Sequence, residues 1–149
     1  MELFQIRAAG PDDIKELLEI ERLSFPTCWL GDFLRREFDP SLVRIWCAFA
    51  VNEPHPMIGY LSAIRVVDEL HLLQLAAHPQ YRRMRVGTTL LEYALGKEKS
   101  LRYALLEVRE TNMAAIAFYQ KMGFYIVGRR RGYYSDSGED ALLLTREIV

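Results

Sequence analysis

Residues 106–124 read LEVRETNMAAIAFYQKMGF, the most specific pattern in the chain. Alternating apolar side chains predict a strand over Tyr103–Val108. Apolar residues then recur at helical spacing over Met113–Met122, and Gly123 is a typical helix stop. The stretch therefore predicts a strand followed directly by a helix, with polar side chains at the junction.

Three polar residues of this stretch are placed where they can meet. Glu107 lies near the end of the predicted strand. Because side chains alternate between the two faces of a strand, it shares a face with Arg109. Asn112 and Tyr119 are two helical turns apart and share a helix face with Ala115. An acid, an amide and a phenol can thus converge on one site. Ordinary structural interpretations stay open beside this one: an ion pair for the acid, a helix cap for the amide and half-buried packing for the phenol.

The rest of the chain divides into further strand-like and helix-like segments. The expected strands are Phe4–Ala8, Arg44–Val51, Ile58–Val67, Leu70–Ala77, Phe124–Gly128 and Ala141–Ile148. The expected helices start at Gly10–Asp13 and fade near Phe25-Pro26, cover Leu30–Phe38, and start again at Gly87. Three consecutive strands with short connections suggest an antiparallel meander. The order of elements predicts an α+β or mixed α/β sheet with helices packed on it.

Length and composition indicate an ordinary globular protein. The 149 residues suggest a single domain, residues 1–149, and 50% hydrophobic with 26% charged residues exclude a disordered chain. A net charge of −1 gives no support to nucleic-acid or membrane-surface binding. The first residues do not have the pattern of a signal peptide, so we expect none, and the apolar stretches are shorter than a membrane span. We therefore expect a soluble, cytoplasmic protein.

A second segment, LAAHPQYRRMRVGT at residues 75–88, has the features of an anion site. A strand ends, arginines follow, and a glycine opens an amphipathic helix, where unpaired N–H groups and the helix dipole attract phosphate. A solvated basic turn is the alternative. The chain contains neither a P-loop motif nor a Gly-x-Gly-x-x-Gly after a strand, so the usual nucleotide-binding motifs are excluded.

This second segment resembles the acyl-CoA-binding motif of the GNAT acetyltransferases, Arg/Gln-x-x-Gly-x-Gly/Ala. Arg82 and Gly87 match its first and last positions, and Arg85 stands where the family usually has glycine. An arginine there could instead contact a CoA phosphate. The residues that the resemblance assigns to acetyl-CoA are Leu75, Ala76, Ala77, Arg82, Arg83, Met84, Arg85, Val86, Gly87, Thr88 and Asn112.

The first segment resembles a second signature of the same family, Asn-x-x-Ala-x-x-x-Tyr-x-x-x-Gly-Phe. Its positions are filled by Asn112, Ala115, Tyr119, Gly123 and Phe124. The preceding Leu-Glu-Val-Arg is similar to that of the ribosomal-protein-alanine N-acetyltransferases (RimI-type), a subfamily that acetylates protein N-termini.

Two further segments resemble the substrate loops of that subfamily. Phe25-Pro26, with Trp29 shortly after, is similar to its Phe-Pro-Trp loop. Tyr133 and Tyr134, followed by Gly-Glu-Asp-Ala at residues 138–141, are similar to its Tyr-Tyr-Pro stretch, with serine in place of proline. The resemblance therefore assigns these five aromatic and proline residues to the acceptor peptide.

The resemblance implies a fold, a reaction and two catalytic roles. The fold is a mixed, mostly antiparallel central sheet flanked by helices and opened where CoA enters. The reaction is acetyl transfer from acetyl-CoA to a primary amine, preferably the α-amine of a protein such as a ribosomal protein. Glu107 would act as the general base, through a water, and Tyr119 as the acid toward the departing thiolate.

Other functions are weighed against this one. One alternative is an enzyme of the same fold that acetylates a lysine side chain or a small-molecule amine. Paired aromatic loops suit a threaded peptide better. A non-catalytic acyl-CoA-binding or nucleic-acid-binding module built on Arg82–Arg85 is disfavoured by the near-neutral charge and by the Glu107 and Tyr119 pair. The three histidines lack metal-ligand spacing, so we expect no metal, and Cys28 is interpreted as a bystander thiol.

Overall fold

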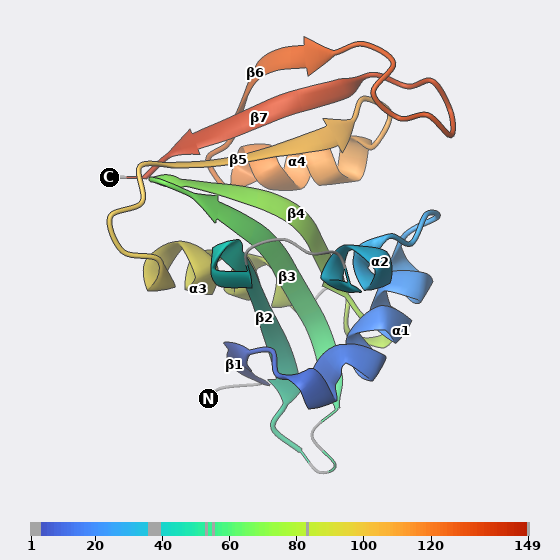
Figure 1. Cartoon of the computed structure of the whole chain (residues 1–149), viewed down its shortest axis with the longest axis vertical. Coiled ribbons are helices and arrows are strands. Elements are labelled where there is room, and N and C mark those ends of the chain that lie inside the picture. Colours follow the sequence, from blue (N-terminus) through green and yellow to red (C-terminus); the bar gives the residue numbers. More distant parts are fainter. Residues whose placement is uncertain (1–3, 36–39, 53, 55, 83, 149) are drawn as a thin grey trace.

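Figure 1 shows the computed structural model, which describes residues 4–35, 40–52, 54, 56–82 and 84–148. One seven-stranded sheet has the strand order β1-β2-β3-β4-β5-β7-β6 in this part of the chain. Its strands are β1 (Phe4–Ala8), β2 (Val43–Ala50), β3 (Met57–Val66), β4 (Glu69–Ala77), β5 (Tyr103–Arg109), β6 (Tyr125–Arg130) and β7 (Ala141–Glu147). The helices are α1 (Ile14–Ser24), α2 (Leu30–Arg35), α3 (Val86–Lys97) and α4 (Met113–Lys121).

The predicted fold class is confirmed. The strands β2, β3 and β4 form the expected antiparallel meander, and the β4–β5 pair is parallel, which makes the sheet mixed but mostly antiparallel. The boundaries of the elements lie within a few residues of the predicted ones. The described part of the helix predicted over Leu30–Phe38 is α2, and Phe38 itself lies outside the described residues.

Helices cover both faces of the sheet, and the alternation along β2 shows why. Trp46 and Ala48 belong to the buried cluster that includes Leu90 of α3. Cys47, between them, belongs to the cluster that includes Leu17 of α1. Since successive side chains of a strand point to opposite faces, the strand supplies apolar contacts to two layers of helix.

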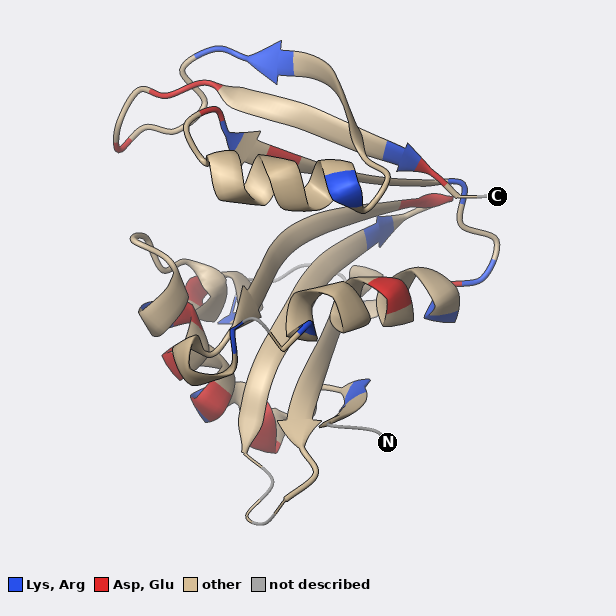
Figure 2. Cartoon of the chain, turned by 180° about the vertical axis from the view of Figure 1, so that it is seen from behind, with Lys and Arg blue, Asp and Glu red and all other residues tan. Residues whose placement is uncertain are grey.

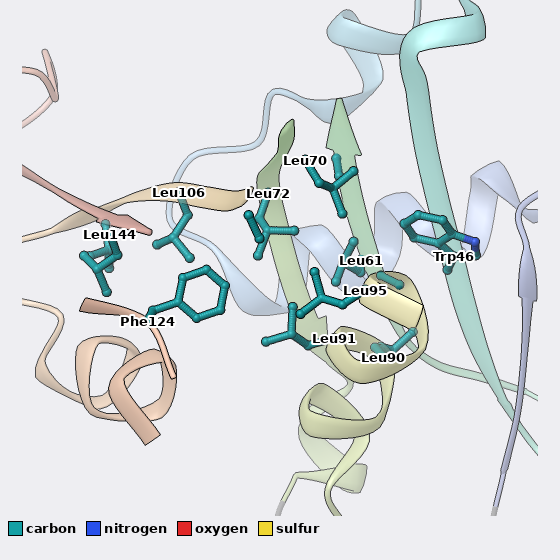
Figure 3. Packing of buried hydrophobic residues seen from close by; sticks show 14 of the residues in the cluster. Trp46, Leu61, Leu70, Leu72, Leu90, Leu91, Leu95, Leu106, Phe124 and Leu144 are labelled. Carbon is teal, nitrogen blue, oxygen red and sulfur yellow. The ribbon is translucent and has the colours of Figure 1, made fainter. Parts of the chain in front are cut away.

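The α3 and α4 face is one continuous core. Figure 3 shows Leu106, Phe124 and Leu144 on the side of β5 and β7, and Leu91 and Leu95 of α3 on the other side. Burying each such side chain contributes about 1.5–3 kcal/mol to folding. This core joins the half of the sheet made of β1–β4 to the half made of β5–β7.

That separation occurs between β4 and β5. The parallel pairing joins residues 69–71 of β4 to residues 103–105 of β5, and the two strands then diverge (Figure 1). The pairing of β3 with β4 also shifts register between Ser62 and Ala63, and such an irregularity bends a strand. The sheet is therefore opened on one side, between the second halves of β4 and β5. Within the described residues, every helix is too short or too polar to cross a membrane.

Candidate active site

A cavity of about 700 Å³ fills the opening between β4 and β5. Five elements form its walls: the α1–α2 loop, β4, β5, α4 and the β6–β7 loop. We call residues 25–29 the first rim loop and residues 131–140 the second rim loop. The lining residues are Ser24, Phe25, Pro26, Thr27, Trp29, Leu72, Leu73, Gln74, Leu75, Leu106, Glu107, Val108, Arg109, Asn112, Ala115, Tyr119, Tyr133, Tyr134, Ser135 and Asp136.

Glu107 presents a carboxylate to this cavity from β5. Its side chain keeps 34% of its accessible surface, so solvent reaches it. The Tyr133 hydroxyl donates a hydrogen bond to its Oε2 at 3.4 Å, and Nη2 of Arg130 lies 3.7 Å from its Oε1. Glu107 thus has an ion-pair partner, as the structural interpretation predicted. Its carboxylate nevertheless remains partly accessible to solvent.

Tyr119 faces the same cavity from α4. Its ring packs edge-on against Phe118 and Phe124, at centroid distances of 5.1 and 5.5 Å. Burial raises the pKa of its hydroxyl above the usual value of 10.0, so the phenol keeps its proton at neutral pH. The packing interpretation is correct for the ring, and Tyr119 also lines the cavity.

Asn112 caps α4, as the structural alternative predicted. Its side-chain oxygen accepts a hydrogen bond from the backbone N–H of Ala115 at 3.1 Å. Both residues line the cavity. The cap thus fixes where α4 begins and, with it, the position of Tyr119 two turns later.

The predicted anion site lies at the beginning of α3. Arg85, its N-cap, has a left-handed backbone with φ of 62°, the conformation that favours the glycine found there in the family pattern. Gly87 lies in the first turn, where a Cβ would come within 3.8 Å of Leu75 Cδ2 and 3.7 Å of Phe118 Cζ. The start of α3 is therefore adjacent to β4 and to α4.

The structure distributes the residues assigned to acetyl-CoA over three settings. Leu75 and Asn112 line the cavity. The side chains of Ala76 and Val86 are buried in the two cores, Ala77 packs partly buried against one of them, and Gly87 and Thr88 are partly exposed. Arg82, Met84 and Arg85 are exposed on the surface, and Arg83 lies outside the described residues.

All five residues assigned to the acceptor line the cavity, on two opposite rims. Trp29 packs edge-on against Phe33 at 5.5 Å, and Tyr133 packs edge-on against Tyr134 at 5.1 Å. Burial raises the pKa of Tyr134 to about 12. The two rim loops touch across the opening, where the Thr27 hydroxyl donates to Asp136 Oδ2 at 3.4 Å.

Sequence reasoning missed three lining residues that organise the site: Gln74, Arg109 and Asp136. Arg109 donates to both carboxylate oxygens of Asp136 at 2.9 and 2.7 Å, and its guanidinium lies 4.0 Å from the Tyr134 ring centroid. The strand alternation had placed Arg109 on the face of Glu107. The signal for Gln74 was a single amide in the apolar strand β4.

The described part of the chain contains no group of three or more His, Cys, Asp or Glu side chains placed to hold a metal ion. Cys28 is an exposed free thiol and Cys47 a buried one. Desolvation raises the pKa of the Cys28 thiol and raises that of Cys47 to about 12, which disfavours the nucleophilic thiolate form.

Comparisons with known proteins agree with this geometry. Residues 13–124 match the model of the Acetyltransferase (GNAT) family. A Bacillus subtilis protein provisionally named a ribosomal protein bS18-alanine N-acetyltransferase is 36% identical over 142 residues, covering 93% of this chain and 92% of the relative. An N-alpha-acetyltransferase of Saccharolobus solfataricus is 32% identical over 160 residues, covering 97% and 93%.

A solved structure extends the likeness to three dimensions. The crystal structure of the ribosomal-protein-S18-alanine N-acetyltransferase from Escherichia coli superposes with a TM-score of 0.84 at 27% identity. The match covers 97% of this chain and 94% of the other. With an opened sheet, a cavity at the opening and a family model that spans most of the sequence, the chain belongs to the GNAT family of acetyltransferases.

Proposed function

We propose that this protein transfers the acetyl group of acetyl-CoA to the N-terminal α-amine of another protein, in a ternary complex. One observation carries the proposal. A single cavity is lined by Glu107, by Tyr119 and by the aromatic residues of both rim loops. The names of the Bacillus and Escherichia relatives make a ribosomal protein that begins with alanine the first acceptor to test.

The beginning of α3 fits the pyrophosphate of CoA. The N–H groups of Val86, Gly87 and Thr88 belong to the first helical turn, which leaves donors without intrahelical partners. The exposed side chains of Arg82 and Arg85 add positive charge nearby. Because Leu75 is adjacent to Gly87, a CoA held at α3 would extend along β4 into the cavity.

Glu107 accepts the proton of the attacking amine in this mechanism. The α-amine is the suitable acceptor because its pKa is about 8, against about 10.4 for lysine, so less free energy is needed to deprotonate it. A water relays the proton, since the Glu107 side chain is partly accessible to solvent. The amine nitrogen then attacks the thioester carbonyl carbon.

Two other groups stabilise the negative charge that develops on the carbonyl oxygen and on the departing sulfur. A backbone N–H near the end of β4, at residues 75–77, would face the carbonyl oxygen while negative charge develops on it. As the carbon–sulfur bond breaks, the Tyr119 hydroxyl, which is protonated at neutral pH, gives its proton to the CoA sulfur. The tyrosinate then takes up the proton that the amine released, so the enzyme returns to its starting state. The transfer needs no covalent enzyme intermediate.

A competition between amines in one peptide tests the proposal. The substrate is a peptide with a free N-terminal alanine and an internal lysine, incubated with the enzyme and labelled acetyl-CoA. We expect label on the α-amine only, and no label when that amine is blocked. Label on the lysine, or transfer only to a small polyamine, would favour the other acceptor classes. Acetyl-CoA binding without turnover on any amine would favour a non-catalytic module.

A further inference from the structure

A buried carboxylate lies beneath the first rim loop. Glu21, on α1, is 2% exposed. Its Oε2 accepts three hydrogen bonds, from the backbone N–H of Trp29 at 3.1 Å, the backbone N–H of Leu30 at 2.9 Å and Nε2 of Gln74 at 2.9 Å. One oxygen atom therefore joins the end of the first rim loop and the start of α2 to the strand β4.

The second half of this link runs through the sheet. Gln74 is 6% exposed and lines the cavity, and its Oε1 accepts a hydrogen bond from the Tyr60 hydroxyl on β3 at 2.9 Å. Both ends of the Gln74 amide are thus occupied. Since a buried amide cannot turn without losing one of these bonds, Gln74 holds the Glu21 carboxylate at a set place on the sheet.

A carboxylate is an expensive choice for a purely structural position. Moving it out of water costs several kcal/mol, which only good donors offset, and an apolar residue of similar volume is often as stabilising. Three donors at 2.9–3.1 Å make the burial tolerable here. What an apolar side chain could not supply is a fixed distance between Trp29 and β4.

We propose that Glu21 is a positioning residue that sets the width of the acceptor opening. Through the N–H groups of Trp29 and Leu30 it holds the first rim loop against Gln74, so the Trp29 ring keeps its place in the cavity wall. Glu21 itself touches neither acceptor nor CoA. The inference rests on the proposed function, because it assigns the first rim loop to the acceptor peptide.

The decisive variant is Gln74→Glu. It puts a second carboxylate within hydrogen-bond distance of Glu21, and like charges at this range repel strongly in a buried site. We expect the acceptor KM to rise about tenfold, the order of one charge-assisted contact, with acetyl-CoA affinity close to wild type. Lower pH should reduce the defect, because a protonated carboxyl can donate to its neighbour.

The double variant Glu21→Gln/Gln74→Glu, called the exchanged pair, should reverse the defect of Gln74→Glu. The introduced amide can accept from the loop N–H groups and donate to the introduced carboxylate, which can still accept from Tyr60. We expect it to recover most of the acceptor KM. Tyr60→Phe is the matched control: it removes the Tyr60 bond to Gln74 and leaves the three bonds to Glu21, so thermal stability should fall while the acceptor KM rises much less than in Gln74→Glu.

A measurement without substrate separates this inference from the proposed function. Amide hydrogen exchange at Trp29 and Leu30 should be slow in the wild type, faster in Gln74→Glu and slow again in the exchanged pair. If no peptide is acetylated but this pattern holds, the proposed function fails and the link stands. If exchange is unchanged in Gln74→Glu, or the exchanged pair is no better than the single variant, Glu21 has no positioning role.

Discussion

The two rim loops of the cavity are held by different physical means. The first is tied to the sheet by hydrogen bonds to the buried carboxylate of Glu21. The second is tied to β5 by Arg109, which pairs with Asp136 and Glu139 at a part-exposed position. Figure 2 shows acidic residues along the second rim loop and basic residues in the neighbouring strands.

This difference predicts different behaviour. Buried hydrogen bonds in a low dielectric respond little to salt, whereas exposed charge pairs are screened and each contributes at most about 1 kcal/mol. The second rim loop gains from having several such pairs, since Arg129 also binds Asp140 and Glu110. We therefore expect the first rim loop to be a fixed rim of the acceptor opening and the second rim loop to be an adjustable rim. The reacting groups lie between them.

The largest effect should come from the reacting acid itself. Glu107→Gln removes the proposed base and should lower kcat by about 10²–10⁴, with acetyl-CoA affinity retained. Steady-state kinetics and calorimetry measure the two quantities. Wild-type turnover would return Glu107 to the role of a partner for Arg130.

Tyr119→Phe should have a smaller effect on the same step. The ring contacts with Phe118 and Phe124 remain, so only the hydroxyl is lost. A thiol with a pKa near 8.5 leaves tolerably well without protonation, and we expect kcat to fall by roughly tenfold. Single-turnover measurement of acetyl transfer tests this. A loss as large as that of Glu107→Gln would mean that departure of the thiolate limits the rate.

Arg109→Ala breaks the adjustable rim and leaves the fixed rim in place. Without the guanidinium, Asp136 and Glu139 lose a partner and Tyr134 loses the contact on its ring. We expect the acceptor KM to rise by several-fold to about tenfold, with kcat nearly kept. Raising the salt concentration should weaken acceptor binding in the wild type more than in this variant.

Arg129→Ala is the matched control for that experiment. Arg129 pairs with Asp140 at 2.9 Å at the far end of the same loop, and neither residue lines the cavity. Its loss should affect the acceptor KM much less. If the two arginine variants behave alike, the charge of the loop rather than its attachment beside Tyr134 controls the acceptor.

Arg85→Gly tests the cofactor side, away from both rims, and should move two quantities in opposite directions. Glycine adopts the left-handed backbone at this position without strain, so the free energy of unfolding should rise by about 1 kcal/mol. If the guanidinium contacts a CoA phosphate, acetyl-CoA affinity should fall by roughly tenfold. Unchanged affinity together with higher stability would show that Arg85 contributes only strain.

The smallest expected effect is a pH response confined to the second rim loop. The hydrogen bond from Arg109 lowers the pKa of Asp136, and bonds from Thr111, Ser137 and Arg109 lower that of Glu139. A lowered folded-state pKa adds stability above the unfolded pKa of about 4, which is lost as the pH falls through the folded value. The protection of the Tyr134 and Gly138 amides, measured against intrinsic exchange at each pH, should therefore fall below about pH 4. An equal loss of protection at Trp29 would contradict the comparison.

Local sequence patterns were sufficient for most of the fold. The two-residue period of β5, the helical period of α4 and the stop at Gly123 are short-range signals, and the structure places these elements within about two residues of the prediction. The cap role of Asn112 is equally local, since it spans three residues. The residues assigned to the acceptor came from the resemblance to known loops, and all of them line the cavity.

The sequence by itself thus determined the elements, the family signature and the candidate reacting groups. Only the tertiary structure decided how β4 and β5 diverge and which side chains tie the rims together. Glu21 and Gln74 are 53 residues apart, and Thr27 and Asp136 are 109 apart. Such pairs leave no mark in a local period, because burial and hydrogen-bond geometry select them only after the sheet has brought distant segments into contact.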